Sequence, residues 1–316
     1  MFIATRDDPA LFAPILADAE PHQFGSPFSR LIAMTKLVRA IRGFRPNLVY
    51  MRWDLFYPPL SWLPANAPLV VEINTDDLVE NALGSRLRSW YNRITRGFLF
   101  RRARALVFVT TELSQRASFG RHGNRHVITN GIDLTAYPVR PALQHDRPRL
   151  VFVGSPDQPW QGLDKVLALA SIHRDWQYDV VVVPTPTADA PPNVSWYGRL
   201  SRADLIAVLS QAEVGLGTLA LHRKAMDEAA SLKMREYLAM GLPVIYANDD
   251  PDVDSLGPLV LRIANTETNV LDDLLLIEDY VRRSRGTRIP RSLVDHIDVA
   301  SKEAQRLALF ESLART

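Results

Sequence analysis

The sequence predicts an α/β protein built from two doubly wound domains. Short runs rich in valine, isoleucine and leucine alternate with stretches of helical periodicity, a pattern typical of parallel sheets. The pattern fills the first half of the 316-residue chain, stops at a proline-rich segment and then starts again. This length suits two domains of roughly 150 residues each. We expect the domains to face each other across a cleft, with ligands at the carboxyl ends of the strands.

In the first half, strands are expected at residues 48–53, 69–74, 105–109 and 126–129. Helical periodicity covers about 29–43 and 80–102, and a shorter helix begins at Glu112. Three prolines then occur within the twelve residues 137–148. Because proline fixes φ and has no backbone donor, we place an interdomain linker at 139–148, after a first domain of residues 1–138.

The second half repeats the alternation. Strands are expected at residues 150–154, 179–183, 194–197, 214–217, 243–247 and 259–263, several of them continuous apolar runs, as in strands covered on both faces. Helices are expected at residues 163–173, 203–211, 231–240, 269–282 and 295–313. We assign residues 149–292 to the second domain. The remaining segment, 293–316, contains a long amphipathic helix that follows Pro290, and we expect this helix to pack back on the first domain.

The composition is globular, with 47% hydrophobic and 23% charged residues. No apolar run approaches the roughly 18 residues of a transmembrane helix, and the start, with Asp7 and Asp8, lacks a signal-peptide pattern. The chain has no cysteine, which excludes disulfides and thiolate chemistry and fits a reducing compartment. We expect a cytoplasmic protein, with peripheral binding to the inner face of a membrane as an open alternative.

Positive charge is concentrated in the first half. Residues 1–145 carry 18 Lys and Arg against 11 Asp and Glu, and the remainder 19 against 24. Two stretches without acids hold this excess: Arg30, Lys36, Arg39, Arg42, Arg45 and Arg52, then Arg86, Arg88, Arg93, Arg96, Arg101, Arg102 and Arg104. They indicate either a solvated basic surface or a face for anionic lipid, with Leu87, Trp90, Ile94, Phe98 and Leu99 as its apolar side. No recognition motif favours nucleic acid.

The segment 215–245 is the richest in potential chemistry. A strand leads to a polar loop with His222, Arg223, Lys224 and Glu228, and a helix then ends at Gly241. Free N–H groups at the start of that helix suit a pyrophosphate, and they belong to Ala230, Ser231, Leu232 and Lys233. Nearby cations can add charge for the same phosphates. Taken alone, two glutamates at this spacing favour the interpretation that Glu228 and Glu236 are solvated surface residues.

The residues around this segment resemble a known family. Glu228, seven residues, Glu236 and a helix end of the Ala-x-Gly-x-Pro-Val type follow in order, the last formed by Ala239, Gly241, Pro243 and Val244. Asn130, Gly131 and Asp133, and the strand, glycine turn and helix of residues 150–170, also match. Together, residues 105–247 resemble the retaining glycosyltransferases with the GT-B fold, of the family 4 or group 1 type.

That resemblance implies two Rossmann-like domains and a metal-independent, retaining transfer of a hexose-type sugar. The donor would be a nucleotide sugar such as a UDP- or GDP-sugar, and the acceptor a hydroxyl of a glycan or lipid-linked molecule. Glu228 would position the donor sugar and Glu236 the ribose. Asn74 or Asp76 of the first domain would lie near the reacting carbon. A catalytically silent nucleotide-sugar-binding partner and a GT-B epimerase are the alternatives.

The chain departs from the family pattern at two phosphate-binding positions. Many members have Arg after the glycine turn that Gly154 begins, and Lys before the next glycine; here these positions hold Ser155 and Gln161. Either Lys165, Arg223 or Lys224 replaces the missing charges, or phosphate binding is weaker than in the family. The first domain also resembles a shortened version of the family's. His122 and His126 have metal-like spacing, but Gly123 and Asn124 lie between them, and we expect no metal site.

Overall fold

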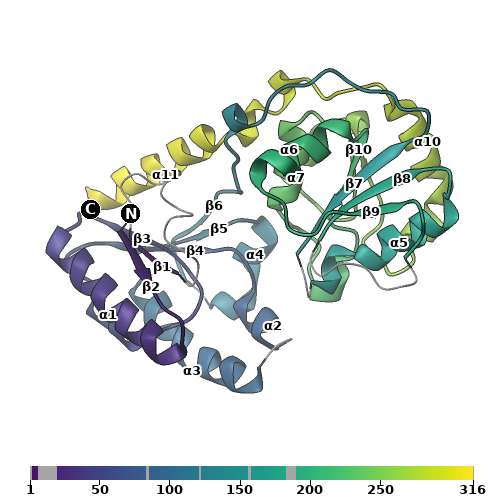
Figure 1. The fold of residues 1–316 in the computed structure, drawn as a ribbon. Coiled ribbons are helices and arrows are strands. Elements are labelled where there is room, and N and C mark those ends of the chain that lie inside the picture. Colours follow the sequence, from purple (N-terminus) through teal and green to yellow (C-terminus); the bar gives the residue numbers. More distant parts are fainter. Residues whose placement is uncertain are drawn as a thin grey trace. The chain divides into compact units, whose positions relative to one another are not determined.

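The computed structural model describes residues 2–5, 20–82, 85–120, 122–155, 158–182 and 190–315. Contacts divide the chain into two compact units (Figure 1). The first unit comprises Met1–Val109, Leu113–Val127 and Leu307–Thr316, and the second comprises Thr110–Glu112 and Ile128–Arg306. The segment 139–148, predicted as a linker, belongs to the second unit.

The first unit is built on a four-stranded parallel sheet in the order β3-β4-β5-β6. Its strands are Val49–Arg52, Leu69–Ile73, Ala105–Phe108 and Arg125–Val127. Every residue of β5 is buried, as expected for a strand covered on both faces. The helices are α1 (Pro27–Phe44), α2 (Asp77–Ala82), α3 (Arg86–Arg102) and α4 (Thr111–Gln115), with a 3₁₀ turn, η2, at Pro58–Trp62.

The expected helix over 80–102 is two helices. Ser85 has extended backbone geometry and its side chain accepts a hydrogen bond from the Arg88 N–H, so α3 begins there with its own N-cap. The prediction that Arg96 and Leu99 belong to an exposed basic face and its apolar side is also wrong. Both are buried, because they lie on the face of α3 that packs into the core, where Arg96 pairs with Asp77 at 2.5 Å.

A separate two-stranded parallel sheet precedes this core, formed by β1 (Phe2–Thr5) and β2 (Glu20–Gln23). These two strands are not among those expected from the sequence, because β2, with the sequence EPHQ, contains no apolar run. The last helix, α11 (Val299–Ala314), continues from the second unit into the first. Within the first unit, its Phe310 ring lies 5.1 Å from that of Tyr50, and Leu309 and Leu313 are buried.

The second unit contains a six-stranded parallel sheet in the order β12-β11-β10-β7-β8-β9. In chain order these strands are β7 (Arg149–Val153), β8 (Gln177–Val181), β9 (Val194–Trp196), β10 (Val214–Leu216), β11 (Val244–Tyr246) and β12 (Val260–Arg262). The helices are α5 (Leu163–Ile172), α6 (Arg202–Gln211), α7 (Leu232–Ala239), α8 (Pro251–Asp254), α9 (Asn269–Asp272) and α10 (Leu274–Ser284). The helix expected over 269–282 is thus divided near Asp273.

These two parallel sheets with their helices confirm the α/β prediction, and every strand expected from the sequence is present within one or two residues. In the second unit, apolar side chains fill both faces of the sheet and form two buried clusters. The carboxyl ends of β7, β10 and β11, which lie next to one another in the sheet, therefore share one edge.

Candidate functional site

Two glycines bring the loops and α7 close to the sheet at this edge. A Cβ on Gly154, after β7, would lie 2.9 Å from both Gln161 Oε1 and Val182 Cγ2. A Cβ on Gly217, after β10, would lie 2.5 Å from the sulfur of Met234 in α7. Larger residues would push the turn and the helix away. The glycines thus fix where the first turn of α7 meets the strand ends.

Helix α7 begins without a side-chain cap. Ser231 stands at the N-cap position with extended geometry, yet its hydroxyl makes no cap hydrogen bond and is buried without a partner among the described residues. The backbone carbonyl of Ala230 accepts from the Asn130 amide at 2.7 Å, and the Leu232 side chain is exposed. The helix ends at Gly241, whose φ of +71° suits a glycine. At its other end, no side chain in the described part of the chain caps the first N–H groups, which are the groups of a helix that suit an anion.

Lys233 lies in the first turn of the same helix. Its side chain is only 8% exposed, and Nζ has no hydrogen-bond partner in the part of the chain that the structure describes. The ammonium lies 4.2 Å from the centre of the Phe152 ring, which partly compensates its charge. Burial lowers the pKa of Lys233 to about 7. A buried ammonium without an acceptor is costly, so an anion bound here would be strongly favoured.

Glu236 lies one turn further along α7 and is half-buried. Its Oε1 accepts a hydrogen bond from the Tyr137 hydroxyl at 3.0 Å, and burial raises the pKa of Glu236. Burial, reinforced by the neighbouring carboxylate, raises the pKa of Tyr137 to about 12, so the phenol remains a donor at neutral pH. No residue in the described ranges donates a hydrogen bond to the second oxygen of Glu236.

Glu228 is buried, not an exposed loop residue. Its two carboxylate oxygens accept hydrogen bonds from the backbone N–H groups of Thr111 and Glu112, at 3.0 and 2.6 Å. The side chain of Glu112 in turn accepts from the N–H groups of Asp227 and Glu228, at 2.9 and 2.8 Å. All these residues belong to the second unit. The charge of Glu228 is thus held by backbone dipoles rather than by a cation.

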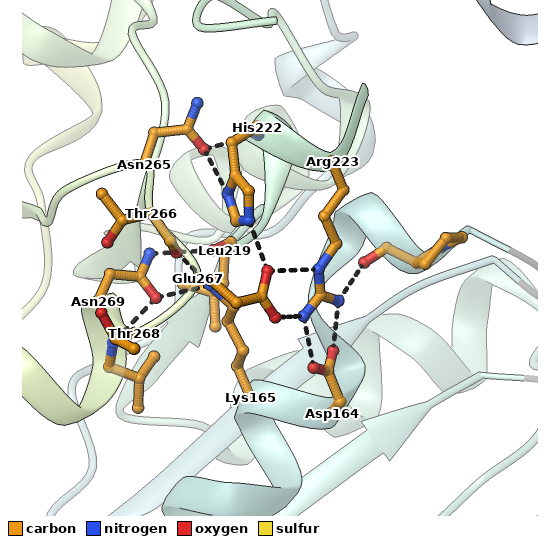
Figure 2. Close-up of polar contacts among 12 residues, drawn as sticks. Asp164, Lys165, Leu219, His222, Arg223, Asn265, Thr266, Glu267, Thr268 and Asn269 are labelled. Carbon is orange, nitrogen blue, oxygen red and sulfur yellow. Dashed lines mark hydrogen bonds and ion pairs between the residues drawn. The ribbon is translucent and has the colours of Figure 1, made fainter. Parts of the chain in front are cut away.

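Arg223 and His222, from the 3₁₀ turn η6 (Leu221–Lys224), belong to a self-contained ionic network that we call the Arg223 cluster (Figure 2). Arg223 binds both oxygens of Asp164, at 2.9 and 2.7 Å, and its Nε donates to Glu267 at 3.0 Å. The His222 ring contacts the same Glu267 at 2.7 Å. These contacts lower the pKa of Glu267 to about 2. The guanidinium therefore already faces two carboxylates.

Lys165 is buried beside this cluster and fixes the loop before α9 (Figure 2). Its Nζ donates to the Thr266 carbonyl at 2.5 Å and to the Asn269 amide oxygen at 2.9 Å. Burial lowers the pKa of Lys165. Lys224, also buried, has its ammonium 4.8 Å from the centre of the Trp160 ring. The N–H of Ser155 donates to the Gln161 amide oxygen at 3.1 Å, so these two uncharged residues brace the glycine turn.

Asn74 and Asp76 lie in the first unit, after β4. The Asn74 amide donates to Glu72 at 2.8 Å, and its oxygen is buried without a partner among the described residues. Asp76 is buried and accepts from the Leu78 N–H and the Ser118 hydroxyl, each at 3.1 Å. Asp76 thus caps α2, whereas Asn74 retains a free acceptor.

Sequence reasoning misses the partners that give these side chains their roles. Tyr137, Glu112 and Glu267 lie 99, 116 and 44 residues from the groups that they contact. No spacing rule connects such positions. No group of three or more His, Asp or Glu side chains within the described ranges could hold a metal ion. No helix there is both long and apolar enough to cross a membrane.

A scan against protein-family models finds no match, and neither does a search of curated proteins. Solved structures do share the fold. Sucrose-phosphate synthase from Thermosynechococcus elongatus is 17% identical, with a TM-score of 0.67 and coverage of 94% of this chain and 82% of that one. Anabaena Alr3699/HepE, solved with UDP and glucose, is 17% identical, with a TM-score of 0.66 over 98% and 91%.

A third neighbour is an α-glucosyltransferase solved with UDP-glucose and DNA containing an abasic site. It is 10% identical, with a TM-score of 0.64 over 98% of this chain and 90% of that one. At such low identity the likeness establishes the fold, and it confirms the GT-B prediction made from residues 105–247.

Proposed function

We propose that this chain is a retaining, metal-independent glycosyltransferase. It transfers a hexose-type sugar from a nucleoside diphosphate sugar to a hydroxyl of a glycan or lipid-linked acceptor. The donor occupies the carboxyl edge of the sheet in the second unit, with its diphosphate at the N-terminus of α7. The structural neighbours solved with UDP and glucose or with UDP-glucose support this donor class.

The observation that carries the proposal is the buried, unpartnered pair at the start of α7. Lys233 Nζ and Ser231 Oγ are both withdrawn from solvent, and neither has a hydrogen-bond partner among the residues described. Together with the uncapped N–H groups they provide a cation, a hydroxyl donor and a helix dipole, which suit a diphosphate. An anion here would relieve the cost of burying both groups.

The other residues of α7 suit the rest of the donor. The half-buried Glu236 lies one turn beyond Lys233 and can accept hydrogen bonds from ribose hydroxyls. Glu228 precedes the helix, and its negative charge would stabilise positive charge that develops at the anomeric carbon. In the reaction, the acceptor oxygen bonds to that carbon on the face from which the diphosphate departs. Because attack and departure use the same face, the configuration is retained, and the acceptor proton passes to the leaving phosphate oxygen.

A donor panel tests this proposal. UDP-, GDP- and dTDP-sugars are titrated against the purified protein, and the thermal unfolding midpoint is recorded, since a bound ligand stabilises the folded state. We expect a shift with one donor and transfer of its sugar with retained configuration, in the presence of EDTA. Binding without turnover across an acceptor panel would favour a silent binding protein, and sugar inversion without transfer would favour an epimerase. No shift with any donor would overturn the proposal.

A further inference from the structure

Helix α3 presents an exposed apolar stripe to solvent. Leu87, Trp90, Ile94 and Phe98 are between 54 and 75% exposed, and at 3.6 residues per turn they fall within about 80° of the helix circumference. The opposite face of the helix, with Leu99 and Phe100, already packs into the core of the first unit. The fold therefore does not need the stripe, and a contiguous exposed patch of this kind marks a binding surface.

All the charged side chains that α3 itself carries are positive. Arg86, Arg93 and Arg101 are exposed on α3, and the Arg101 guanidinium lies 5.5 Å from the centre of the Phe98 ring. The sequence has no acid between Glu80 and Glu112. We call these three arginines and the four apolar residues the α3 surface. Its chemistry is an apolar strip with a basic border, which fits a bilayer with negative headgroups.

Helix α1 adds a second set of the same kind. Phe28, Ile32 and Phe44 are exposed on it, as are Lys36, Arg39 and Arg42. Asp54 joins the two helices, because its carboxylate binds Arg30 of α1 and Arg88 of α3. Both helices therefore belong to one side of the first unit, where they lie next to each other (Figure 1).

Two other occupants fit the α3 surface less well. A second copy of the chain, docked through the same face, would bring its arginines against those of the first, and α3 carries no acid to pair with them. Nucleic acid would match the charge, but it would leave Leu87 and Ile94 without an apolar partner. An anionic lipid surface satisfies both the charge and the apolar stripe.

We propose that the α3 surface, assisted by α1, binds the interface of membranes that contain anionic lipids. Leu87, Trp90, Ile94 and Phe98 insert at the boundary between headgroups and acyl chains, while the arginines contact the headgroups. The proposal is independent of any donor or acceptor, so its test needs neither.

The full-length chain is sedimented with vesicles of phosphatidylcholine, with or without roughly one-third phosphatidylglycerol. We expect binding to the anionic vesicles only, weakened in high salt, where the screening length shrinks to about 3 Å. Arg93→Gln should lower the partition coefficient about fivefold, and Trp90→Gln about tenfold or more. Arg174→Gln and Leu275→Gln, which change exposed residues of the second unit, should leave partitioning unchanged.

A site-specific readout comes from the absence of cysteine in the chain. A polarity-sensitive dye on Leu87→Cys should shift to the blue with anionic vesicles, whereas the same dye on Leu275→Cys should not. Equal recovery with neutral and anionic vesicles, or no shift at position 87, would overturn the proposal. So would a shift at position 87 that depends on protein concentration without vesicles, since that result would mean a second copy covers the surface.

Discussion

The Arg223 cluster and the N-terminus of α7 both contain positively charged side chains. Of the two regions, the cluster is the one in which the positive charge is paired with carboxylates. Arg223 faces Asp164 and Glu267, whereas Lys233 is buried without a hydrogen-bond partner in the described residues. A self-satisfied network stabilises the fold and has little capacity left for a ligand. A buried cation without an acceptor costs folding free energy and lowers the cost of binding an anion. The paired charges of the cluster thus stabilise the second unit, whereas we propose that the charge of Lys233 serves a substrate.

The largest expected effect comes from Lys233→Met. Donor affinity should fall about a hundredfold or more, because removing the charged partner of a buried contact costs about 2–5 kcal/mol. The free energy of unfolding without donor should rise, since methionine fills similar space without burying a charge. Calorimetric titration and urea denaturation measure the two quantities, with the exposed Lys36→Met as the control. If Lys233→Met kept wild-type donor affinity, the proposal that Lys233 binds the donor while the Arg223 cluster does not would be wrong.

Glu228→Gln tests a buried residue that accepts backbone hydrogen bonds and that we propose acts on the donor sugar. Turnover should fall about a hundredfold, because the charge opposite the reacting carbon is lost. Glutamine offers one acceptor oxygen where two backbone N–H groups now bind, so the free energy of unfolding should fall by about 1–3 kcal/mol. Steady-state kinetics and urea denaturation provide the measurements.

Glu112→Gln is the matched control for Glu228→Gln. Both N–H groups that donate to Glu112 bind the same carboxylate oxygen, so the single amide oxygen of glutamine can accept both hydrogen bonds. It should keep near wild-type turnover. If Glu112→Gln lost as much turnover as Glu228→Gln, the effect would be structural, and the assignment of Glu228 to the sugar would fail.

The pH dependence of stability sharpens the comparison further. Lys233 loses its proton near pH 7 in the folded state, but near 10.5 in the unfolded state. The unfolded state therefore binds more protons between these values, and stability rises with pH by up to about 1.4 kcal/mol per unit. Below pH 7 both states are protonated, and the burial cost is fully present. Urea denaturation from pH 6 to 10 should show this rise in wild type and its absence in Lys233→Met; parallel curves would contradict it.

The smallest effect on donor binding is expected for Arg223→Met. Its carboxylate partners are more than half exposed, so solvent screens the ion pairs and they contribute little to the free energy of unfolding. Donor affinity should change by less than about fivefold, which corresponds to about 1 kcal/mol. The same titration decides the point. A hundredfold loss would mean that the cluster opens and that Arg223, not Lys233, receives the phosphates.

Much of the fold could be predicted because its strands are continuous apolar runs. β4, β5 and β7 are buried nearly throughout, and their sequences show it. Helix boundaries were harder to predict where a single residue changes the backbone. Ser85 caps α3 and divides a periodic stretch that otherwise reads as one helix. Hydrophobic periodicity identifies which face of a helix is buried. It does not identify the residue whose side chain caps the backbone and so starts a second helix.

The candidate site could be predicted by region, but not by role. The spacing of Glu228 and Glu236 identifies α7. In the structure, Glu228 precedes this helix and Glu236 lies within it. The sequence cannot distinguish Lys165 and Arg223 from Lys233, because the side chains that occupy the first two come from distant segments. Asn269 lies 104 residues from Lys165, and Glu267 lies 44 residues from Arg223. From the sequence alone, these three basic residues therefore look equally suited to bind phosphate, and only their partners in the structure distinguish them.

The course of α11 has a consequence for how the protein is made. Residues 307–316 belong to the first unit, although most of that unit precedes residue 128. A ribosome that makes the chain from its N-terminus delivers the second unit before the segment that carries Leu309, Phe310 and Leu313. Domains usually fold in the order of their synthesis. Here Tyr50 must instead wait until α11 has been made before it can pack against Phe310.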